Sequence, residues 1–201
     1  EVEAVIYAWF PGQEFGDALV DLLVGDVEPS GRLPVTLPRR LEDTPAFEHH
    51  PGRNGVAKYL EGRLIGYRWY DTVGREPLFP FGFGLGYADV KIIDASKSGT
   101  HGVDVVVRNE SARAGVQVVQ VYAHRKDRDG LPSDEPDQKL VGYSRVKVAA
   151  NGTTMLHVDL DPDAYRTWDP ETSAWTQWTG NIELRVGTSS RHIAHRIAIT
   201  L

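Results

Sequence analysis

Hydrophobic residues follow two different patterns along the chain. Residues 2–9 (VEAVIYAW) form an almost continuous apolar run, which predicts a strand buried on both faces of a parallel sheet. Residues 15–23 then carry apolar side chains at helical spacing, and Gly25 ends the predicted helix. A short strand over residues 33–37 is predicted next, followed by a polar, proline-containing loop. These elements predict an α/β arrangement for the first part of the chain.

Beyond residue 89 apolar residues alternate with polar ones, which is the period of strands with one buried face. Roughly seven or eight short strands fit this stretch, separated by turn signals rich in Gly, Asn, Asp and Pro. This spacing is typical of an immunoglobulin-like β-sandwich. The sequence therefore predicts an α/β part over residues 1–88 and an all-β sandwich domain over residues 89–201.

The first part contains too few elements for a complete α/β domain. A doubly buried strand needs cover on both faces, and about two helices with a few strands cannot provide it. We therefore interpret residues 1–88 as the C-terminal part of a larger α/β sandwich domain. Residues 89–201 are numerous enough to form a core of their own.

Composition narrows the class of protein. With 41% hydrophobic and 25% charged residues, the 201-residue chain has the composition of a folded protein. Its 28 acidic and 22 basic residues give a net charge of −6, so we expect no nucleic-acid partner. No apolar run approaches the roughly 18 to 20 residues of a membrane span, so no membrane partner is expected. The absence of Cys excludes disulfides and leaves the compartment open between cytoplasm and secretion, with the cytoplasm slightly favoured.

Several motifs occur in a fixed order along the chain. The first part contains AWFPGQE (8–14), PSGRLPVT (29–36), GYRWYD (66–71) and PLFPFGFGL (77–85), and the second contains GVQVVQVY (115–122), LVGY (140–143) and VGTSS (186–190). Together they resemble the C-terminal part of glycoside hydrolase family 3, the family of β-glucosidases and their relatives. The resemblance covers essentially the whole chain and implies the end of an α/β sandwich followed by a fibronectin type III-like domain. Gly86 departs from the family pattern, which commonly has Ser there.

The resemblance implies that this chain is part of a glycosidase but contributes no catalytic residue. Members are retaining glycosidases, and retaining hydrolysis needs a pair of carboxyl groups. Both lie upstream of the AWFPGQE motif in the family pattern, so no catalytic residue is expected here and the isolated chain should be inactive. The expected role is to scaffold the active site of a β-glycosidase, a β-glucosidase above all, that hydrolyses terminal β-linked glucosyl residues.

The same resemblance implies the partners. They are the upstream barrel and α/β portion of the same enzyme and, through the complete enzyme, a β-glucoside or oligosaccharide substrate. The predicted strand at residues 2–9 needs cover on both faces, which the upstream portion would provide. Association into a homo-oligomer could also cover it. No cofactor is expected.

Candidate site residues each have a structural alternative. Tyr67, Trp69 and Tyr70 could line the outer rim of the sugar site, although packing is the usual role of such an aromatic cluster. Glu61 and Arg68 are seven positions apart, about two helical turns, so a structural ion pair is favoured over a catalytic role for Glu61.

Two further groups carry no ligand prediction. His49 and His50 lack a third ligand at a suitable spacing, so no metal site is expected. The acidic residues between positions 127 and 135 do not follow the spacing of a calcium-binding loop, so a solvated turn is predicted there.

The main alternative for the whole chain is an independent carbohydrate-binding or protein-interaction module without catalysis. The doubly buried strand at residues 2–9 argues against it, because an autonomous module would not begin with half a sheet. A complete small enzyme with an unrecognised site is a second alternative, and an activity assay on the purified chain separates it from the others.

Overall fold

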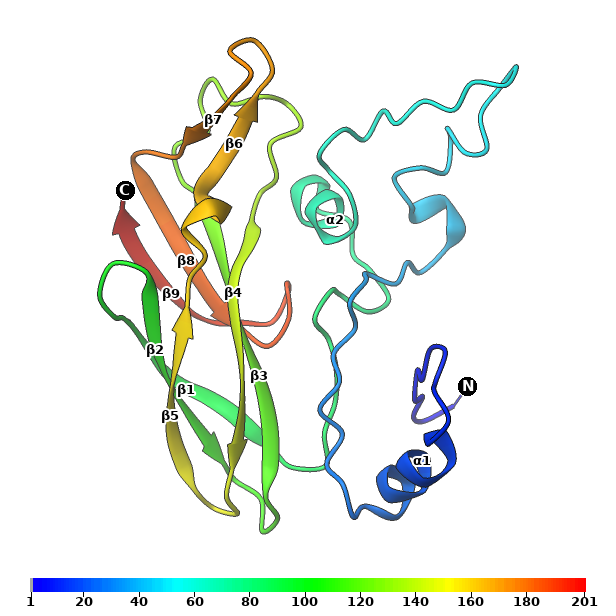
Figure 1. The fold of residues 1–201 in the computed structure, drawn as a ribbon, viewed down its shortest axis with the longest axis vertical. Helices are drawn as coiled ribbons and strands as arrows, with labels where there is room; N and C mark the ends of the chain where they lie inside the picture. The colour runs from blue at the N-terminus through cyan, green and yellow to red at the C-terminus, as the bar shows by residue number, and fades with distance from the viewer. Residues whose placement is uncertain (1) are drawn as a thin grey trace.

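A computed structural model describes residues 2–201, and most of its regular structure is antiparallel β-sheet (Figure 1). Two sheets pack face to face in the second part of the chain. The first sheet has the order β1-β2-β5 and the second has the order β4-β3-β8-β9. Their strands are β1 (Val90–Lys97), β2 (Gly102–Asn109), β3 (Gly115–Arg125), β4 (Lys139–Val148), β5 (Thr153–Asp159), β8 (Asn181–Gly187) and β9 (Ile193–Thr200).

A small hairpin extends from one end of this sandwich. It consists of β6 (Arg166–Asp169) and β7 (Ala174–Gln177), and the short 3₁₀ helix η2 (Pro162–Tyr165) precedes it. Trp168 and Trp175 pair across the hairpin, with ring centroids 5.5 Å apart.

The core lies between the two sheets and is rich in valine. Alternate residues of β2 point inward, and its three valines at positions 103, 105 and 107 are fully buried. The facing sheet contributes Val119, Val121, Ile182, Leu184 and Val186, each at most 1% exposed. Burying a side chain of this kind contributes about 1.5–3 kcal/mol, so the sandwich has a sufficient core of its own. Strands with one buried face, predicted beyond residue 89 from the alternation of apolar and polar residues, are confirmed.

The first part of the chain has few regular elements. They are α1 (Phe15–Val24), the 3₁₀ helix η1 (Leu41–Asp43) and α2 (Tyr67–Val73), joined by irregular segments. The helix predicted from the spacing of residues 15–23 is confirmed as α1. Gly25 ends it in the left-handed conformation, at φ 85°, with its N–H bonded to the carbonyl of Leu22. Glycine adopts this conformation without steric strain.

The strands predicted in the first part do not form. Residues 2–9 are irregular, and of residues 33–37 only Leu37 forms an isolated bridge, to Phe79. A strand exists only when its N–H and C=O groups bond to a neighbour, and the described residues include no strand beside this segment. This chain taken by itself therefore does not show the α/β sheet predicted for its first part.

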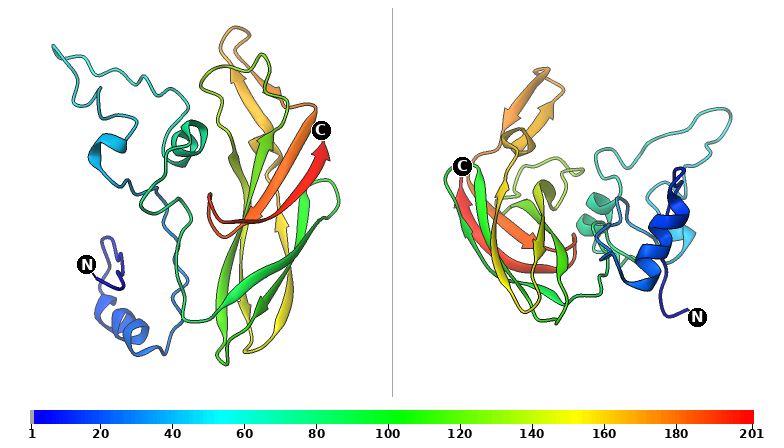
Figure 2. Two further views of the ribbon diagram at one scale, coloured as in Figure 1. Left: turned by 180° about the vertical axis from the view of Figure 1, so that it is seen from behind. Right: turned by 60° about the horizontal axis from the view of Figure 1, so that its bottom comes forward.

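The first part lies along one side of the sandwich (Figure 2). It contacts the sheet that contains β3 and β4 and the turn between β8 and β9. Across the described residues, no helix is long and apolar enough to cross a membrane.

Candidate functional site

Helix α2, which contains most of the GYRWYD motif, is short and stands between two glycines. Gly66 and Gly74 have positive φ angles of 53° and 66°, so a side chain at either position would strain the backbone. The helix has only seven residues and no side-chain N-cap. Helices of this length are marginal by themselves, so its neighbours must stabilise it.

Tyr67 and Tyr70 of α2 point into the protein. The Tyr67 ring stacks on Phe81 at 4.8 Å between centroids and meets the edge of Tyr122 at 5.8 Å. Its hydroxyl accepts a hydrogen bond of 2.9 Å from the N–H of Leu140. Tyr70 is only 3% exposed. Both tyrosines pack α2 against the rest of the chain.

Trp69 occupies a different face of α2 and is half-buried. Its ring meets Tyr70 edge to face at 5.0 Å, and the guanidinium of Arg75 lies 5.8 Å from its centroid. The same guanidinium pairs with the carboxylate of Asp43, which also accepts hydrogen bonds from Arg40. The hydrogen bond from Arg40, together with that from Arg75, holds the pKa of Asp43 below its usual value despite burial. Neither Asp43 nor Arg75 was predicted from the sequence as a site residue.

Glu61 and Arg68 do not form the predicted ion pair. Glu61 lies in a turn before α2 begins at Tyr67, so the helical spacing assumed for the pair does not apply. No ion pair between the two occurs in the described part of the chain, and Glu61 Oε2 is buried without a hydrogen-bond partner.

Arg63, two residues later, makes the ion pairs of this region. Its guanidinium lies 2.6 Å from Asp134 and 3.0 Å from Glu135. Glu135 is 1% exposed, so the prediction of a solvated turn is wrong at this position. Across residues 2–201, no group of three His, Asp or Glu side chains is arranged to hold a metal ion.

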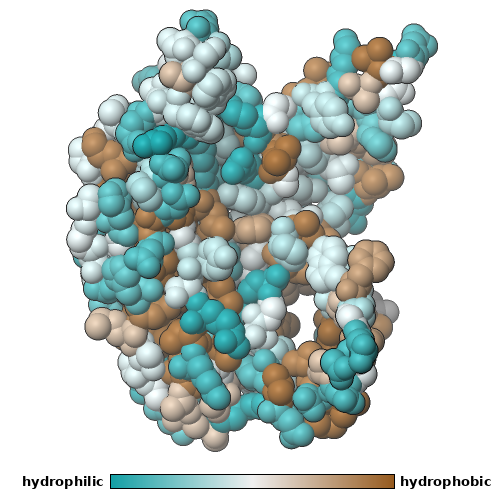
Figure 3. Space-filling view, viewed as in Figure 1, coloured by the Kyte–Doolittle hydropathy of each residue, from teal (hydrophilic) through white to brown (hydrophobic). Residues whose placement is uncertain are grey.

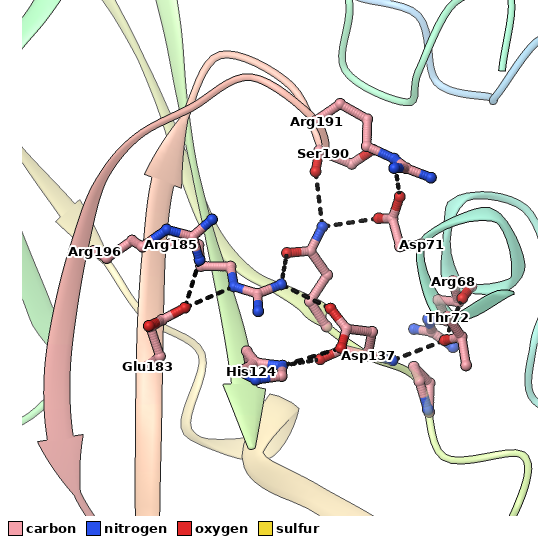
Figure 4. Close-up of polar contacts among 12 residues, drawn as sticks. Arg68, Asp71, Thr72, His124, Asp137, Glu183, Arg185, Ser190, Arg191 and Arg196 are labelled. Atoms are coloured by element: carbon pink, nitrogen blue, oxygen red, sulfur yellow. Dashed lines mark hydrogen bonds and ion pairs between the residues drawn. The ribbon is translucent and has the colours of Figure 1, made fainter. Parts of the chain in front are cut away.

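The C-terminal turn of α2 is bonded to the sandwich (Figure 4). Asp71 pairs with Arg191 Nε at 2.6 Å and accepts a hydrogen bond of 2.8 Å from Gln138 Nε2. The hydroxyl of Thr72 accepts a hydrogen bond of 2.8 Å from the N–H of Asp137. These contacts join one turn of helix to two separate loops of the sandwich.

The network continues inside the sandwich. Asp137 pairs with Arg185 at 2.7 Å, and its carbonyl accepts a hydrogen bond from His124 Nδ1. Although burial opposes it, the hydrogen bonds from His124 and Arg185 hold the pKa of the Asp137 carboxyl far below its usual value. Arg185 in turn pairs with Glu183, which also binds Arg196. The loop that receives α2 is thus fixed by charged groups on neighbouring strands.

Asp71 should make stability depend on pH. Burial, opposed by the hydrogen bond from Gln138 and by Arg191, raises its pKa from 3.8 to about 6. An acid with a raised folded-state pKa binds protons more tightly when folded, so its contribution to stability is lost as pH rises from about 4 to about 6. This change corresponds to roughly 3 kcal/mol.

The variant Asp71→Asn cannot titrate at this position. The free energy of unfolding of the natural chain, measured relative to this variant by urea denaturation, should therefore decrease by roughly 3 kcal/mol between pH 4 and pH 7. A constant difference across this range, or one that increases with pH, would contradict the assignment.

Comparison with known proteins identifies the family. Residues 1–87 match the family model described as the glycosyl hydrolase family 3 C-terminal domain, and residues 117–190 match that of a fibronectin type III-like domain. A β-glucosidase of Rhizobium radiobacter is 37% identical, over 100% of this chain and 25% of that enzyme. An exo-α-(1→6)-L-arabinopyranosidase of Bifidobacterium breve is 34% identical, over 99% of this chain and 26% of that enzyme.

Solved structures of the same family are similar to this chain. The GH3 β-glucosidase of Bifidobacterium adolescentis has a TM-score of 0.88 at 35% identity, covering 97% of this chain and 29% of that chain. This chain therefore spans about a quarter of the length of the relatives it matches, and it corresponds to their C-terminal portion. Both family models and the solved structures thus agree with the motifs, and the chain belongs to glycoside hydrolase family 3.

Proposed function

We propose that this chain is the C-terminal portion of a retaining β-glycosidase that hydrolyses terminal β-linked glucosyl residues. Residues 2–88 would complete the α/β sandwich domain of that enzyme, and residues 89–201 would form the domain that supports it. The two catalytic carboxylates would come from upstream of this chain, from the barrel and the rest of the α/β domain. The chain itself would scaffold the active site.

Exposed apolar side chains in the first part carry this proposal. Helix α1 buries none of its residues, and Leu23 and Val24 are more than 60% exposed. Phe10 is fully exposed, and Val2 and Val5 are at least 70% exposed. Figure 3 shows hydrophobic residues over this segment, at the lower right, beside an opening in the surface of the molecule. Large exposed apolar side chains gathered in one segment mark an interface.

The rest of the same α/β domain is the partner that best fits this surface. The sandwich has its own core, whereas residues 2–9 have apolar side chains and, among the described residues, no neighbouring strand. A neighbouring strand would satisfy their N–H and C=O groups and turn them into the doubly buried strand that the sequence predicts. The relatives, each about four times as long, contain such an upstream portion.

Trp69 is the residue we assign to the rim of the sugar site. Of the three aromatic residues predicted there, Tyr67 stacks on Phe81 and Tyr70 is buried, whereas Trp69 is half-buried on a different face of α2, beside Arg75. Aromatic faces combine apolar area with a rigid shape, which suits stacking on a pyranose ring. Tyr67 and Tyr70 would then fix the helix that presents Trp69.

A chimera tests the function. In the R. radiobacter β-glucosidase, the C-terminal quarter is replaced by this chain, and hydrolysis of an aryl β-glucoside is measured. We expect the chimera to be active and this chain alone to be inactive, because an enzyme without the carboxylate pair lacks both the attacking group and the proton donor.

A second chimera that contains only residues 89–201 is the control, and it should be inactive because the α/β domain stays incomplete. Turnover by the rigorously purified chain alone would overturn the proposal. A folded but inactive full chimera would favour an independent module instead.

A further inference from the structure

Helix α2 depends on the sandwich for charges and hydrogen bonds that its own sequence lacks. It has no basic residue in its last turn, where the negative end of the helix dipole favours a cation. Arg191, from the turn between β8 and β9, supplies that cation. Its Nη2 donates to the carbonyl of Tyr70 at 2.8 Å, and its Nε pairs with Asp71 at 2.6 Å.

The turn that carries Arg191 is itself held in place. The hydroxyl of Ser189 accepts hydrogen bonds from the N–H groups of Arg191 and His192, at 3.3 and 2.9 Å. Ser190 donates its N–H to the carbonyl of Phe81 and accepts a hydrogen bond from Gln138, which also binds Asp71 (Figure 4). Ser189, Ser190 and Gln138 are each at most 3% exposed. Arg191 therefore meets α2 from a rigid support.

Arg191 is also linked to Trp69 through Arg75. Arg191 Nη2 also donates to the carbonyl of Arg75 at 2.9 Å. The side chain of Arg75 lies over the Trp69 ring and pairs with Asp43. Arg191 thus fixes both the helix that carries Trp69 and the backbone of the residue that stacks on it.

We propose that Arg191 and Gln138 of the fibronectin type III-like domain are positioning residues that set the orientation of Trp69 at the sugar-binding rim. The assignment of the rim rests on the proposed function, whereas the effect on Trp69 is a property of this chain. The sandwich would then determine substrate affinity without touching the substrate. Loss of either positioning residue would loosen α2 and displace the Trp69 ring.

The first test uses this chain. It has five tryptophans, whose indole N–H signals are followed by NMR, and Trp69→Phe identifies the signal of Trp69. In Arg191→Ala we expect the Trp69 signal to shift or broaden and the α2 amides to exchange about tenfold faster. Arg108→Ala is the matched control, because Arg108 is also a sandwich arginine but lies on β2, in the sheet opposite the one that α2 contacts.

Two milder substitutions test the same contacts between the sandwich and α2. Gln138→Ala removes one hydrogen bond to Asp71 and should give a smaller change in the same signal, and Arg191→Lys should restore part of it because the cation remains. If Arg191→Ala does not fold, these two variants decide. An unchanged Trp69 signal in all folded variants would overturn the proposal.

The second test uses the active chimera. Arg191→Ala should raise KM for the aryl β-glucoside about tenfold with little change in kcat, as expected for lost binding rather than lost chemistry. Trp69→Ala should raise KM similarly, and the double variant should add little to either single change. Additive effects, or a loss of kcat alone, would contradict a positioning role. An inactive chimera would count against the proposed function, while the NMR result still decides whether Arg191 orients Trp69.

Discussion

Replacing Arg63 with alanine is expected to lower the free energy of unfolding by about 3 kcal/mol. Arg63 pairs with Glu135, whose side chain is fully buried. Without Arg63, the one ion-pair partner left to the Glu135 carboxylate within residues 2–201 is Lys139, whose Nζ lies 3.8 Å away. Burial lowers the pKa of that lysine to about 8, so its positive charge is lost as the pH rises only slightly above neutral. A buried charge left with so weak a partner is strongly destabilising.

Chemical denaturation measures this effect, and a second substitution tests its cause. Adding Glu135→Gln to Arg63→Ala removes the buried charge, so the double variant should recover much of the lost stability. Arg145→Ala is a suitable control, because Arg145 makes only a hydrogen bond of 3.2 Å to Ser30 at the surface. If the single and double variants were equally unstable, the loss would not come from the unpaired carboxylate.

Gly82→Ala is expected to have an effect of similar or larger size. A Cβ at position 82 would lie 2.0 Å from Gln120 Oε1 and 2.6 Å from its Nε2. Gln120 is buried and donates to the carbonyls of Gly82 and Thr188, at 3.1 and 2.8 Å, while it accepts from the hydroxyl of Tyr122. Displacing it would leave several buried polar groups without partners, each at about 1–3 kcal/mol.

Gly130→Ala is the matched control for this prediction. Gly82 and Gly130 have nearly the same φ, 80° and 77°, but no atom lies within 4 Å of a Cβ at Gly130. Backbone strain is therefore common to both variants, and it should lower stability by about 1–3 kcal/mol in each. A thermal or urea unfolding comparison gives the difference. Equal losses in the two variants would show that the contact with Gln120 is unimportant.

Elements that depend on local sequence were predictable. Helix α1 has apolar residues at helical spacing and a glycine at its end, and both signals lie within the helix itself. The sandwich strands were predictable because each side chain on one face is buried by the facing sheet of the same domain. The sandwich supplies every partner that its pattern requires, whereas α1 forms although this chain buries none of its apolar residues.

Elements that depend on distant or missing partners were not predictable. The apolar run at residues 2–9 indicates a buried strand correctly only if neighbouring strands are present. The burial of Glu135 depends on Arg63, which lies 72 positions away in the sequence. An acidic residue beside Asp134 in a loop normally lies in solvent, so no local pattern indicates its pairing.

The orientation of the GYRWYD motif was partly accessible from helical geometry. Tyr67 and Tyr70 are three positions apart, so a helix places them on the same face, and Trp69 lies on a different one. This spacing predicts that the two tyrosines share an environment. It does not indicate which face meets the sandwich, because that depends on Phe81, Tyr122 and Leu140, far along the chain.

The bond between Arg191 and the carbonyl of Tyr70 has a consequence for synthesis on the ribosome. The two residues are 121 positions apart, and Arg191 is translated long after α2 has left the exit tunnel. The first part of a nascent chain normally folds first. Here α2 must wait until the last two strands emerge, because its stabilising cation lies between them. During that interval chaperones and proteases could bind the exposed GYRWYD segment. Once β9 is complete, α2 would pack against the sandwich and the segment would no longer be accessible to them.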